Sequence, residues 1–173
     1  MDKKKIFLVG FMGSGKSTIG RLLAKKLKVP FVDIDEEIEI REGLTIPQIF
    51  SLKGEPYFRN LELEVLKDVT LSLPSFVMAT GGGLGANPKA MEFMKQHGVV
   101  IWLDIPFETF LKRTAKDNNR PLLQKPRDKL LSLFNQRKEI YQRAHLHVES
   151  QKSIDQTLQK ILNLLFYNKE VNL

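Results

Sequence analysis

A glycine-rich segment near the start of the chain has the residue types and spacing of a phosphate-binding loop. Residues 10–17 read Gly-Phe-Met-Gly-Ser-Gly-Lys-Ser, which fits the pattern G-x-x-x-x-G-K-[ST]. Glycines let backbone N–H groups turn inward around phosphate oxygens, Lys16 can reach the outer phosphates, and the Ser17 hydroxyl can bind magnesium. The segment therefore predicts a site for a nucleoside triphosphate. The residues expected to contact it here are Gly13, Ser14, Gly15, Lys16, Ser17 and Thr18.

Such a loop works between a buried strand and the start of a helix, and the flanking sequence supplies both. Lys5–Val9 is a short apolar run, and apolar residues recur at helical spacing over 17–27. Further strands are expected at 31–35, 75–80, 99–104 and 146–149, and further helices at 35–41, 46–52, 55–69, 88–96, 107–115, 127–143 and 154–166. Strands that alternate with helices predict an α/β fold, in which helices cover both faces of a parallel sheet.

The composition fits one compact domain that spans residues 1–173. Hydrophobic residues make up 42% of the chain, and no repeat, low-complexity tract or linker divides it. The absence of cysteine excludes a disulfide scaffold, a cysteine nucleophile and a thiolate metal site. The longest apolar run covers only residues 99–103, far short of the ~20 residues that span a bilayer, and no targeting sequence is evident. We therefore expect a cytoplasmic protein without membrane contact.

Positive charge is concentrated in the second half of the chain. The net charge is +7, and residues 112–143 hold ten basic and three acidic side chains, an excess equal to the net charge of the whole chain. A solvated basic helix face, a nucleic-acid site and a pocket for a small anionic ligand would each give this pattern. Aromatic residues for base stacking are sparse in this segment, which argues against nucleic acid.

The rest of the sequence narrows the class of nucleotide-binding protein. No Asn-Lys-x-Asp motif for guanine is present, and 173 residues are few for a motor or transporter ATPase. Asp104 ends a hydrophobic strand, so it is either a strand-end cap or a rival ligand for magnesium. A small single-domain phosphotransferase remains. The segment 117–126, with its turn formers and two prolines, is expected to be an exposed, mobile loop that closes over the phosphates.

Further motifs, in this order along the chain, resemble those of the shikimate kinases. They are Phe-Val-Asp-Ile-Asp at 31–35, Ile-Pro-Gln-Ile-Phe at 46–50, Gly-Glu-Pro-Tyr-Phe-Arg-x-x-Glu at 54–62, three glycines at 81–83, Arg-Pro-Leu-Leu at 120–123 and Arg-x-x-x-Tyr at 137–141. The resemblance implies Mg²⁺-dependent transfer of the γ-phosphoryl group of ATP to the 3-hydroxyl of shikimate, in the pathway to aromatic amino acids. It also implies the fold of nucleoside monophosphate kinases: a five-stranded parallel sheet, a substrate-binding helical region at about 35–65 and a lid at about 117–126.

The resemblance assigns roles on the substrate side. Arg59 and Arg137 match arginines that bind the shikimate carboxylate, for which a planar guanidinium fork is well suited. Glu62 matches a glutamate that holds the first arginine, and the alternative is an ordinary helix ion pair at i,i+3 spacing. Asp35 matches an aspartate that bonds the substrate hydroxyls and accepts the 3-hydroxyl proton, with capping of the next helix as the alternative. Further substrate contacts are expected from Gly81, Gly82, Gly83, Phe50 and Phe58, with a flexible turn and core packing as the alternatives.

On the nucleotide side, Asp33 matches an aspartate that binds magnesium through water, and Ala79 and Thr80 leave no carboxylate at the usual alternative position. Arg120 matches a lid arginine that stabilises the transferring phosphoryl group. Arg113 matches a residue that stacks on adenine, with helix-surface charge as the alternative. A further adenine-contacting loop is usual near residues 150–153, but Ser-Gln-Lys-Ser there does not permit an assignment. The expected catalytic residues are Lys16, Asp35 and Arg120.

Two other functions stay open at this point. Another small-molecule kinase of the same architecture, such as a gluconate or nucleoside monophosphate kinase, would not need Arg59, Arg137 and Asp35 in this order. A nucleotide-dependent nucleic-acid binder rests only on the positive charge. The expected partners are therefore ATP and shikimate, without nucleic acid, and the expected oligomeric state is a monomer.

Overall fold

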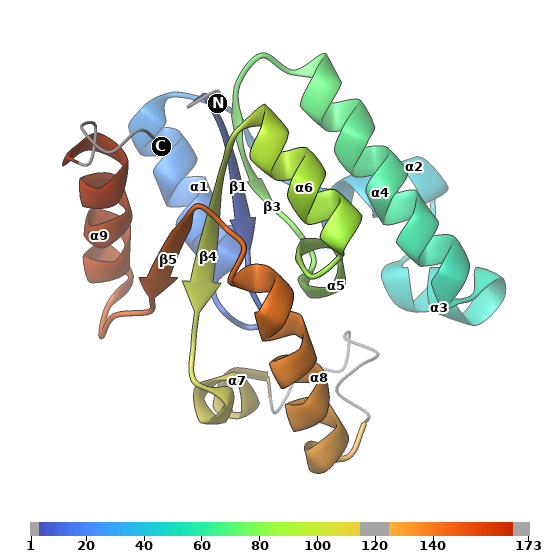
Figure 1. The fold of residues 1–173 in the computed structure, drawn as a ribbon. Coiled ribbons are helices and arrows are strands. Elements are labelled where there is room, and N and C mark those ends of the chain that lie inside the picture. Colours follow the sequence, from blue (N-terminus) through green and yellow to red (C-terminus); the bar gives the residue numbers. More distant parts are fainter. Residues whose placement is uncertain (1–3, 115–124, 168–173) are drawn as a thin grey trace.

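The computed structural model describes residues 4–114 and 125–167, in which one sheet lies between two layers of helices (Figure 1). The strands are β1 (Lys5–Val9), β2 (Phe31–Asp33), β3 (Phe76–Ala79), β4 (Val99–Asp104) and β5 (Leu146–Glu149). The helices are α1 (Lys16–Leu27), α2 (Ile34–Glu42), α3 (Ile46–Lys53), α4 (Glu55–Ser72), α5 (Gly82–Gly85), α6 (Pro88–His97), α7 (Phe107–Thr114), α8 (Arg127–Tyr141) and α9 (Ile154–Tyr167). The expected strands and helices are all present, with ends shifted by a few residues.

The five strands form one parallel sheet in the order β2-β3-β1-β4-β5. The central strand β1 pairs with β3, where Lys5 is opposite Phe76, and with β4, where Ile6 is opposite Val99. The carboxyl ends of parallel strands meet at one edge, and ligands bind there, where the chain order changes direction beside the central strand. This sheet confirms the expected fold class and places the phosphate loop, which leaves β1, at that edge.

Side chains of β1 alternate between two hydrophobic cores, one on each face of the sheet. Ile6 and Leu8 belong to the core under α1 and α9, whereas Phe7 and Val9 belong to the core under α4, α6 and α8 (Figure 1). A strand buried on both faces is apolar throughout, which explains the uninterrupted apolar run before the phosphate loop. Within the described residues, no helix is both long and apolar enough to cross a membrane.

The helical region beside the sheet has clear local start signals. Thr45 and Gln48 form a reciprocal capping box at the start of α3, and Pro47 lies in the first turn of that helix. Gly54, with a φ angle of 88°, separates α3 from α4 in a backbone conformation that favours glycine. Helix α4 then runs from Glu55 to Ser72 and packs against α2, α3, α5 and α6.

Two segments differ from the sequence expectation. The strand predicted at 31–35 ends at Asp33, because the side chain of Asp33 caps a helix that begins at Ile34. The glycine run is not a plain turn, because Gly82 starts the short helix α5 and Gly81 is its N-cap. Both helices therefore begin directly at the carboxyl edge of the sheet.

Candidate active site

The phosphate loop closes around the ammonium group of Lys16. Gly13 and Gly15 have φ angles of 75° and 91°, in the region that favours glycine, and the turn that they form ends at the start of α1. Lys16 Nζ donates to the carbonyl oxygens of Gly10 at 2.6 Å and Phe11 at 3.1 Å. The loop thus holds a cation beside the N-terminus of α1, which itself favours an anion. The geometry is that of a phosphate site.

Asp33 lies between the phosphate loop and α2, and its two carboxylate oxygens have different partners. Oδ1 accepts hydrogen bonds from the backbone N–H groups of Asp35 at 2.9 Å and Glu36 at 3.4 Å. Oδ2 accepts from the Ser17 hydroxyl at 3.0 Å. The alternative that Asp35 caps this helix is therefore wrong, because Asp33 is the cap and Asp35 lies within the first turn.

The Ser17–Asp33 pair has the donor chemistry that suits magnesium. A hydroxyl and a carboxylate are hard oxygen ligands, and both residues line the same cavity. Thr80, at the end of β3, donates its hydroxyl to the carbonyl of Leu8 at 2.8 Å and is buried. The donor set therefore favours Asp33 over the end of β3 as the carboxylate for a metal ion.

A cavity of about 550 Å³ joins the phosphate loop to the carboxyl ends of β2 and β3. Its lining on this side comprises residues 12–19, Asp33, Asp35 and residues 79–82. Lys16 and Asp35 therefore line one cavity, as required of residues expected to act on a transferred phosphoryl group and on its acceptor. Gly13, Ser14, Gly15, Ser17 and Thr18 line it as well.

Residues 81–83 after β3, called the glycine turn below, lie where the side chains expected to bind shikimate converge. A methyl group added at Gly81 would lie 3.1 Å from Asp35 Oδ1 and 3.1 Å from Glu62 Oε2. One added at Gly82 would lie 3.0 Å from Arg137 Nη1. These side chains come from α2, α4 and α8, and they leave little room for a side chain at Gly81 or Gly82. Residues far apart in the sequence meet around it.

Arg59, on α4, is held by a buried carboxylate and two aromatic rings. Its Nη1 lies 2.8 Å from Glu62 Oε1, and its Cζ lies 5.3 Å from the ring centroid of Phe58 and 5.8 Å from that of Phe50. A side chain at Gly83 would overlap the guanidinium. The i,i+3 ion pair with Glu62 is therefore also the contact that holds Arg59 in place, so the two alternatives describe the same interaction. Phe50 and Phe58 flank Arg59 and are not among the described residues that line the cavity; Phe58 belongs to the core.

Glu62 and Arg137 bring charge into the interior. Glu62 is 1% exposed and Arg137 8%. Burial raises the pKa of Glu62 to about 7, against the opposing effect of Arg59, and burial also lowers the pKa of Arg137. Desolvation thus penalises both charges. An anion bound between the guanidinium groups of Arg59 and Arg137 would offset the penalty on Arg137, which makes this corner a candidate carboxylate site.

Arg113 lies on the opposite side of the cavity. Its Nη1 donates to the carbonyl oxygen of Gly13 at 3.0 Å, so the side chain reaches from α7 back to the phosphate loop. It lines the cavity together with residues 150–154 and Thr157. Arg113 therefore borders the cavity at the phosphate loop, and its stacking on adenine stays a prediction. Arg120 and most of the expected lid at 117–126 lie outside the described residues.

Residues 150–154 could not be assigned from sequence, yet they line the cavity beside Arg113. The backbone N–H of Ser150 donates to the carbonyl oxygen of Asp104 at 2.9 Å, and that of Gln151 donates to the Thr157 hydroxyl at 2.9 Å. The usable signal was position: this segment directly follows β5, and the carboxyl ends of parallel strands form the ligand edge of the sheet.

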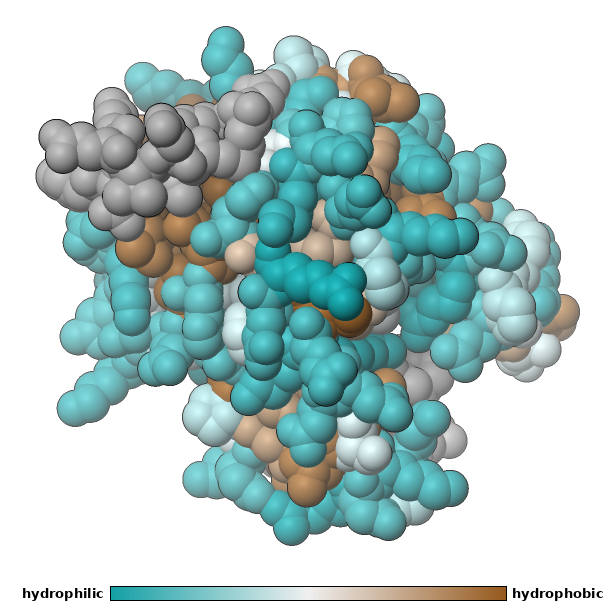
Figure 2. All heavy atoms as spheres, viewed as in Figure 1, coloured by the Kyte–Doolittle hydropathy of each residue, from teal (hydrophilic) through white to brown (hydrophobic). Residues whose placement is uncertain are grey.

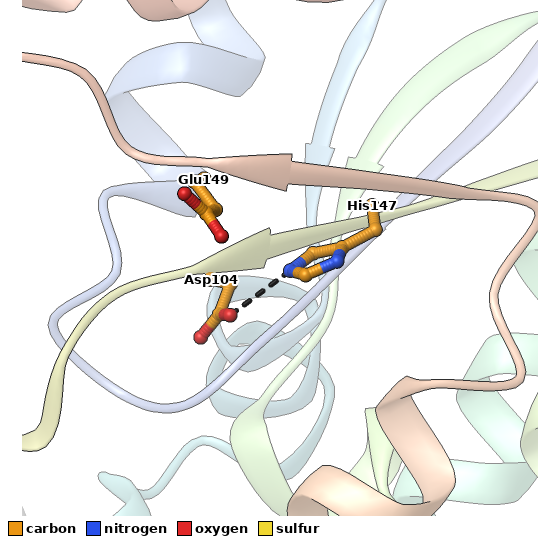
Figure 3. Close-up of side chains that lie close together, drawn as sticks. All are labelled: Asp104, His147 and Glu149. Carbon is orange, nitrogen blue, oxygen red and sulfur yellow. Dashed lines mark hydrogen bonds and ion pairs between the residues drawn. The ribbon is translucent and has the colours of Figure 1, made fainter.

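The carboxylate of Asp104 belongs to a different cluster. Its Oδ2 lies 2.9 Å from Nε2 of His147, and Glu149 lies beside them at the end of β5 (Figure 3). The His147 ring stacks on Trp102 with centroids 4.1 Å apart. Asp104 is not among the described residues that line the cavity. Asp104 therefore bonds to His147 at the end of its strand. The structure does not favour it as a rival of Asp33 for magnesium.

The basic segment 112–143 divides between the ligand sites and the surface. Arg113 reaches the phosphate loop and Arg137 is buried beside the glycine turn, whereas Arg127 pairs with Glu108 in solvent. Polar side chains cover most of the face shown in Figure 2, with hydrophobic residues in small separate patches. The placement of Arg113 and Arg137 therefore favours, for part of this positive charge, the alternative of a pocket for a small anionic ligand.

The parallel sheet, the G-x-x-x-x-G-K-S loop that leads into α1 and the candidate carboxylate site beside it define a small phosphate-loop kinase. The sequence model of the family "Shikimate kinase" matches residues 12–166. The chain belongs to the shikimate kinase family. Among the relatives, a shikimate kinase from Aquifex aeolicus is 51% identical over 158 residues, which cover 91% of this chain and 94% of the relative. One from Acinetobacter baumannii is 46% identical over 168 residues, which cover 95% of this chain and 93% of the relative.

Solved structures give the same assignment. A shikimate kinase from Acinetobacter baumannii in complex with shikimate has a TM-score of 0.91 at 44% identity and covers 96% of this chain and 95% of that chain. A sugar kinase from Janibacter has a TM-score of 0.60 at 17% identity, with 95% of each chain covered. The second likeness concerns the fold alone, so it gives no support to a sugar acceptor.

Proposed function

We propose that this protein transfers the γ-phosphoryl group of ATP to the 3-hydroxyl of shikimate, giving shikimate 3-phosphate and ADP. The observation that carries the proposal is the convergence of Asp35, Arg59, Glu62 and Arg137 around the glycine turn, next to the cavity that Lys16 lines. Membership in the shikimate kinase family and the shikimate-bound relative support the same acceptor.

The nucleotide half binds the triphosphate through backbone N–H groups of residues 13–18, with Lys16 at the β- and γ-phosphates. For this, Lys16 Nζ leaves the carbonyl oxygens of Gly10 and Phe11, so that a phosphate oxygen takes their place. Arg113 and the segment 150–154 border the opposite end of the cavity, where the adenine is expected.

Ser17 and Asp33 would hold Mg²⁺ through the hydroxyl and the carboxylate. Bound there, the ion supplies positive charge that offsets the charge on the β- and γ-phosphate oxygens. Asp33 is already fixed for this purpose, because its other oxygen caps α2.

The substrate half orients shikimate by its carboxylate and its hydroxyl groups. Arg59 and Arg137 bind the carboxylate, for which two guanidinium forks supply charge and direction. Asp35 accepts a hydrogen bond from the 3-hydroxyl and takes its proton as the oxygen attacks the γ-phosphorus. The bond between that phosphorus and the β,γ-bridging oxygen breaks, and ADP leaves. The backbone at Gly81–Gly83 approaches the substrate without side-chain interference.

Arg120 completes the proposed catalytic set from the lid at about 117–126, outside the described residues. A positive side chain there would stabilise the charge that develops on the transferring phosphoryl group. Arg120→Ala is expected to lower kcat by roughly a hundred- to thousandfold, with a much smaller change in shikimate affinity. A variant that keeps more than about a third of wild-type turnover would remove Arg120 from the mechanism.

The oligomeric state and the location of the protein are two further parts of the proposed function. We also propose a single-domain monomer, for which light scattering should give the chain mass of 19.9 kDa. ATP as the phosphoryl donor points to the cytoplasm. Fractionation of the source cells would test that location, and recovery with the periplasmic contents would contradict it.

A coupled ADP-release assay with four candidate acceptors tests the function. Shikimate, quinate, gluconate and AMP are compared at equal concentration with ATP and Mg²⁺. We expect turnover with shikimate to exceed that with each of the others by at least about a hundredfold, because only shikimate matches the carboxylate and hydroxyl groups together. Faster turnover with gluconate or AMP would overturn the proposal in favour of another small-molecule kinase.

A further inference from the structure

Tyr141, the last residue of α8, has a polar contact with the glycine turn that the proposed reaction leaves unexplained. The side chain is 1% exposed, yet its hydroxyl donates to the carbonyl oxygen of Gly82 at 2.6 Å. Gly82 belongs to a segment 59 residues earlier in the chain. A buried hydroxyl that makes so short a bond to a distant loop fixes that loop relative to α8.

The guanidinium of Arg137, one helical turn earlier, borders the same glycine. A methyl group at Gly82 would lie 3.0 Å from Arg137 Nη1 and 3.5 Å from the Tyr141 oxygen. Burial raises the pKa of Tyr141, so the phenol stays neutral. Tyr141 therefore donates to the turn as a neutral phenol, and the Arg137 guanidinium packs against the glycine that this bond holds.

Arg59 and Arg137, the two arginines beside the glycine turn, are held in different ways. Arg59 pairs with the carboxylates of Glu62 and Glu55, which offset part of its charge. Arg137 has its guanidinium against Gly82, which the neutral phenol of Tyr141 holds in place, so this contact leaves its positive charge available. A guanidinium that is oriented in advance loses little conformational freedom when it binds a carboxylate.

We propose that Tyr141 is a positioning residue for substrate binding, which locks the Arg137 guanidinium against Gly82 so that its remaining N–H donors face the substrate carboxylate. This inference rests on the proposed function of Arg137 and adds a residue to it. Tyr141 acts through Arg137 and through the turn, and touches neither the nucleotide nor the transferred group.

The test is Tyr141→Phe, which removes the hydroxyl and keeps the ring. We expect KM for shikimate to rise roughly tenfold, since the short buried bond that holds Gly82 beside Arg137 is lost. Both kcat and KM for ATP should stay within about twofold, because the phosphate loop and Asp35 are unchanged. The matched control is Tyr57→Phe, which removes an exposed hydroxyl bonded to Glu42 and should change none of the three constants.

Two further arms separate positioning from a purely structural role. In an Arg137→Ala background, Tyr141→Phe should not weaken shikimate affinity further, measured by calorimetry. A shikimate analogue with the carboxylate reduced to a hydroxymethyl group should bind wild type and Tyr141→Phe equally. A lowered melting temperature with an unchanged KM, or equal effects on both ligands, would overturn the inference and leave Tyr141 as a core residue.

Failure of the function and failure of this inference give different results. If wild type phosphorylates shikimate and Tyr141→Phe or Arg137→Ala keeps its full affinity, the positioning role is wrong and the function stands. If wild type does not phosphorylate shikimate, the proposed function fails, and this inference fails with it.

Discussion

The nucleotide half and the substrate half of the site are built in opposite ways. The phosphates are expected at one continuous segment, residues 10–18, where backbone groups and the adjacent Lys16 make the site. The substrate corner takes Asp35 from α2, Arg59 and Glu62 from α4, and Arg137 from α8. These side chains meet only because three helices pack around one glycine turn.

The two halves also differ in how their buried charged side chains are stabilised. The phosphate loop satisfies its lysine with its own carbonyl oxygens, at no more than six residues of separation. The substrate corner buries the acid Glu62 of α4 and the arginine Arg137 of α8, and desolvation acts against both charges. Damage to the first half should therefore stop the chemistry and spare the fold, whereas changes in the second half should alter affinity and stability together.

Lys16→Ala tests the nucleotide half with the largest expected effect. We expect kcat/KM to fall by at least about a thousandfold, because a charge at the transferring phosphates is lost. The fold should be intact, since Lys16 Nζ donates to the carbonyl oxygens of Gly10 and Phe11 within the loop and lies outside the two hydrophobic cores. ADP release and far-UV circular dichroism measure the two effects, with Lys25→Ala in the last turn of α1 as the control. Unfolding of the variant would contradict the contrast between the halves.

Glu62 tests the buried charge of the substrate half through pH. Its folded-state pKa is raised from 4.5 to about 7, so between these values the folded protein binds a proton that the unfolded chain has lost. The free energy of unfolding therefore falls, through this group, as pH rises from 4.5 to 7, by roughly 3 kcal/mol. Glu62→Gln should lack this decline. Urea unfolding of both proteins at pH 5 and pH 8 measures it, and parallel pH dependences would show that burial does not control this carboxylate.

Gly83→Ala tests whether the glycine turn sets the position of Arg59. The added methyl group would overlap the guanidinium, which must move because it is the flexible end of its side chain. We expect kcat/KM for shikimate to fall by up to about a hundredfold, the cost of a misplacement of about 1 Å, with little change in KM for ATP. In an Arg59→Ala background the same substitution should add almost nothing. A similar loss in both backgrounds would place the effect in the turn itself.

Arg137→Lys is expected to give the smallest of these changes and tests geometry at constant charge. Lysine keeps the charge and loses the planar fork, so shikimate affinity should fall roughly tenfold while ATP affinity is unchanged. Calorimetry with each ligand separates the two. Unchanged shikimate affinity would remove Arg137 from the carboxylate site and leave Arg59 alone in that role.

Much of the fold followed from patterns within single segments. The apolar run before Gly10 predicted β1, and the helical spacing after Lys16 predicted α1, because burial of each face is written into the order of apolar residues. The boundary at Asp33 was misjudged, since a side-chain cap on α2 overrode the strand pattern. The segment 150–154 gave no signal of its own, because its place in the cavity depends on β5 ending beside β4.

The sequence by itself determined the phosphate loop, since the glycines, the lysine and the serine that make it are neighbours in the chain. Through a resemblance of ordered motifs, it also named Asp35, Arg59 and Arg137 as partners. Only the tertiary structure decided how they meet: Glu62 becomes a buried acid with a raised pKa, and Tyr141 bonds to Gly82. The physical reason is that desolvation and side-chain hydrogen bonds arise from packing between helices α4, α5 and α8, which no local pattern of residues encodes.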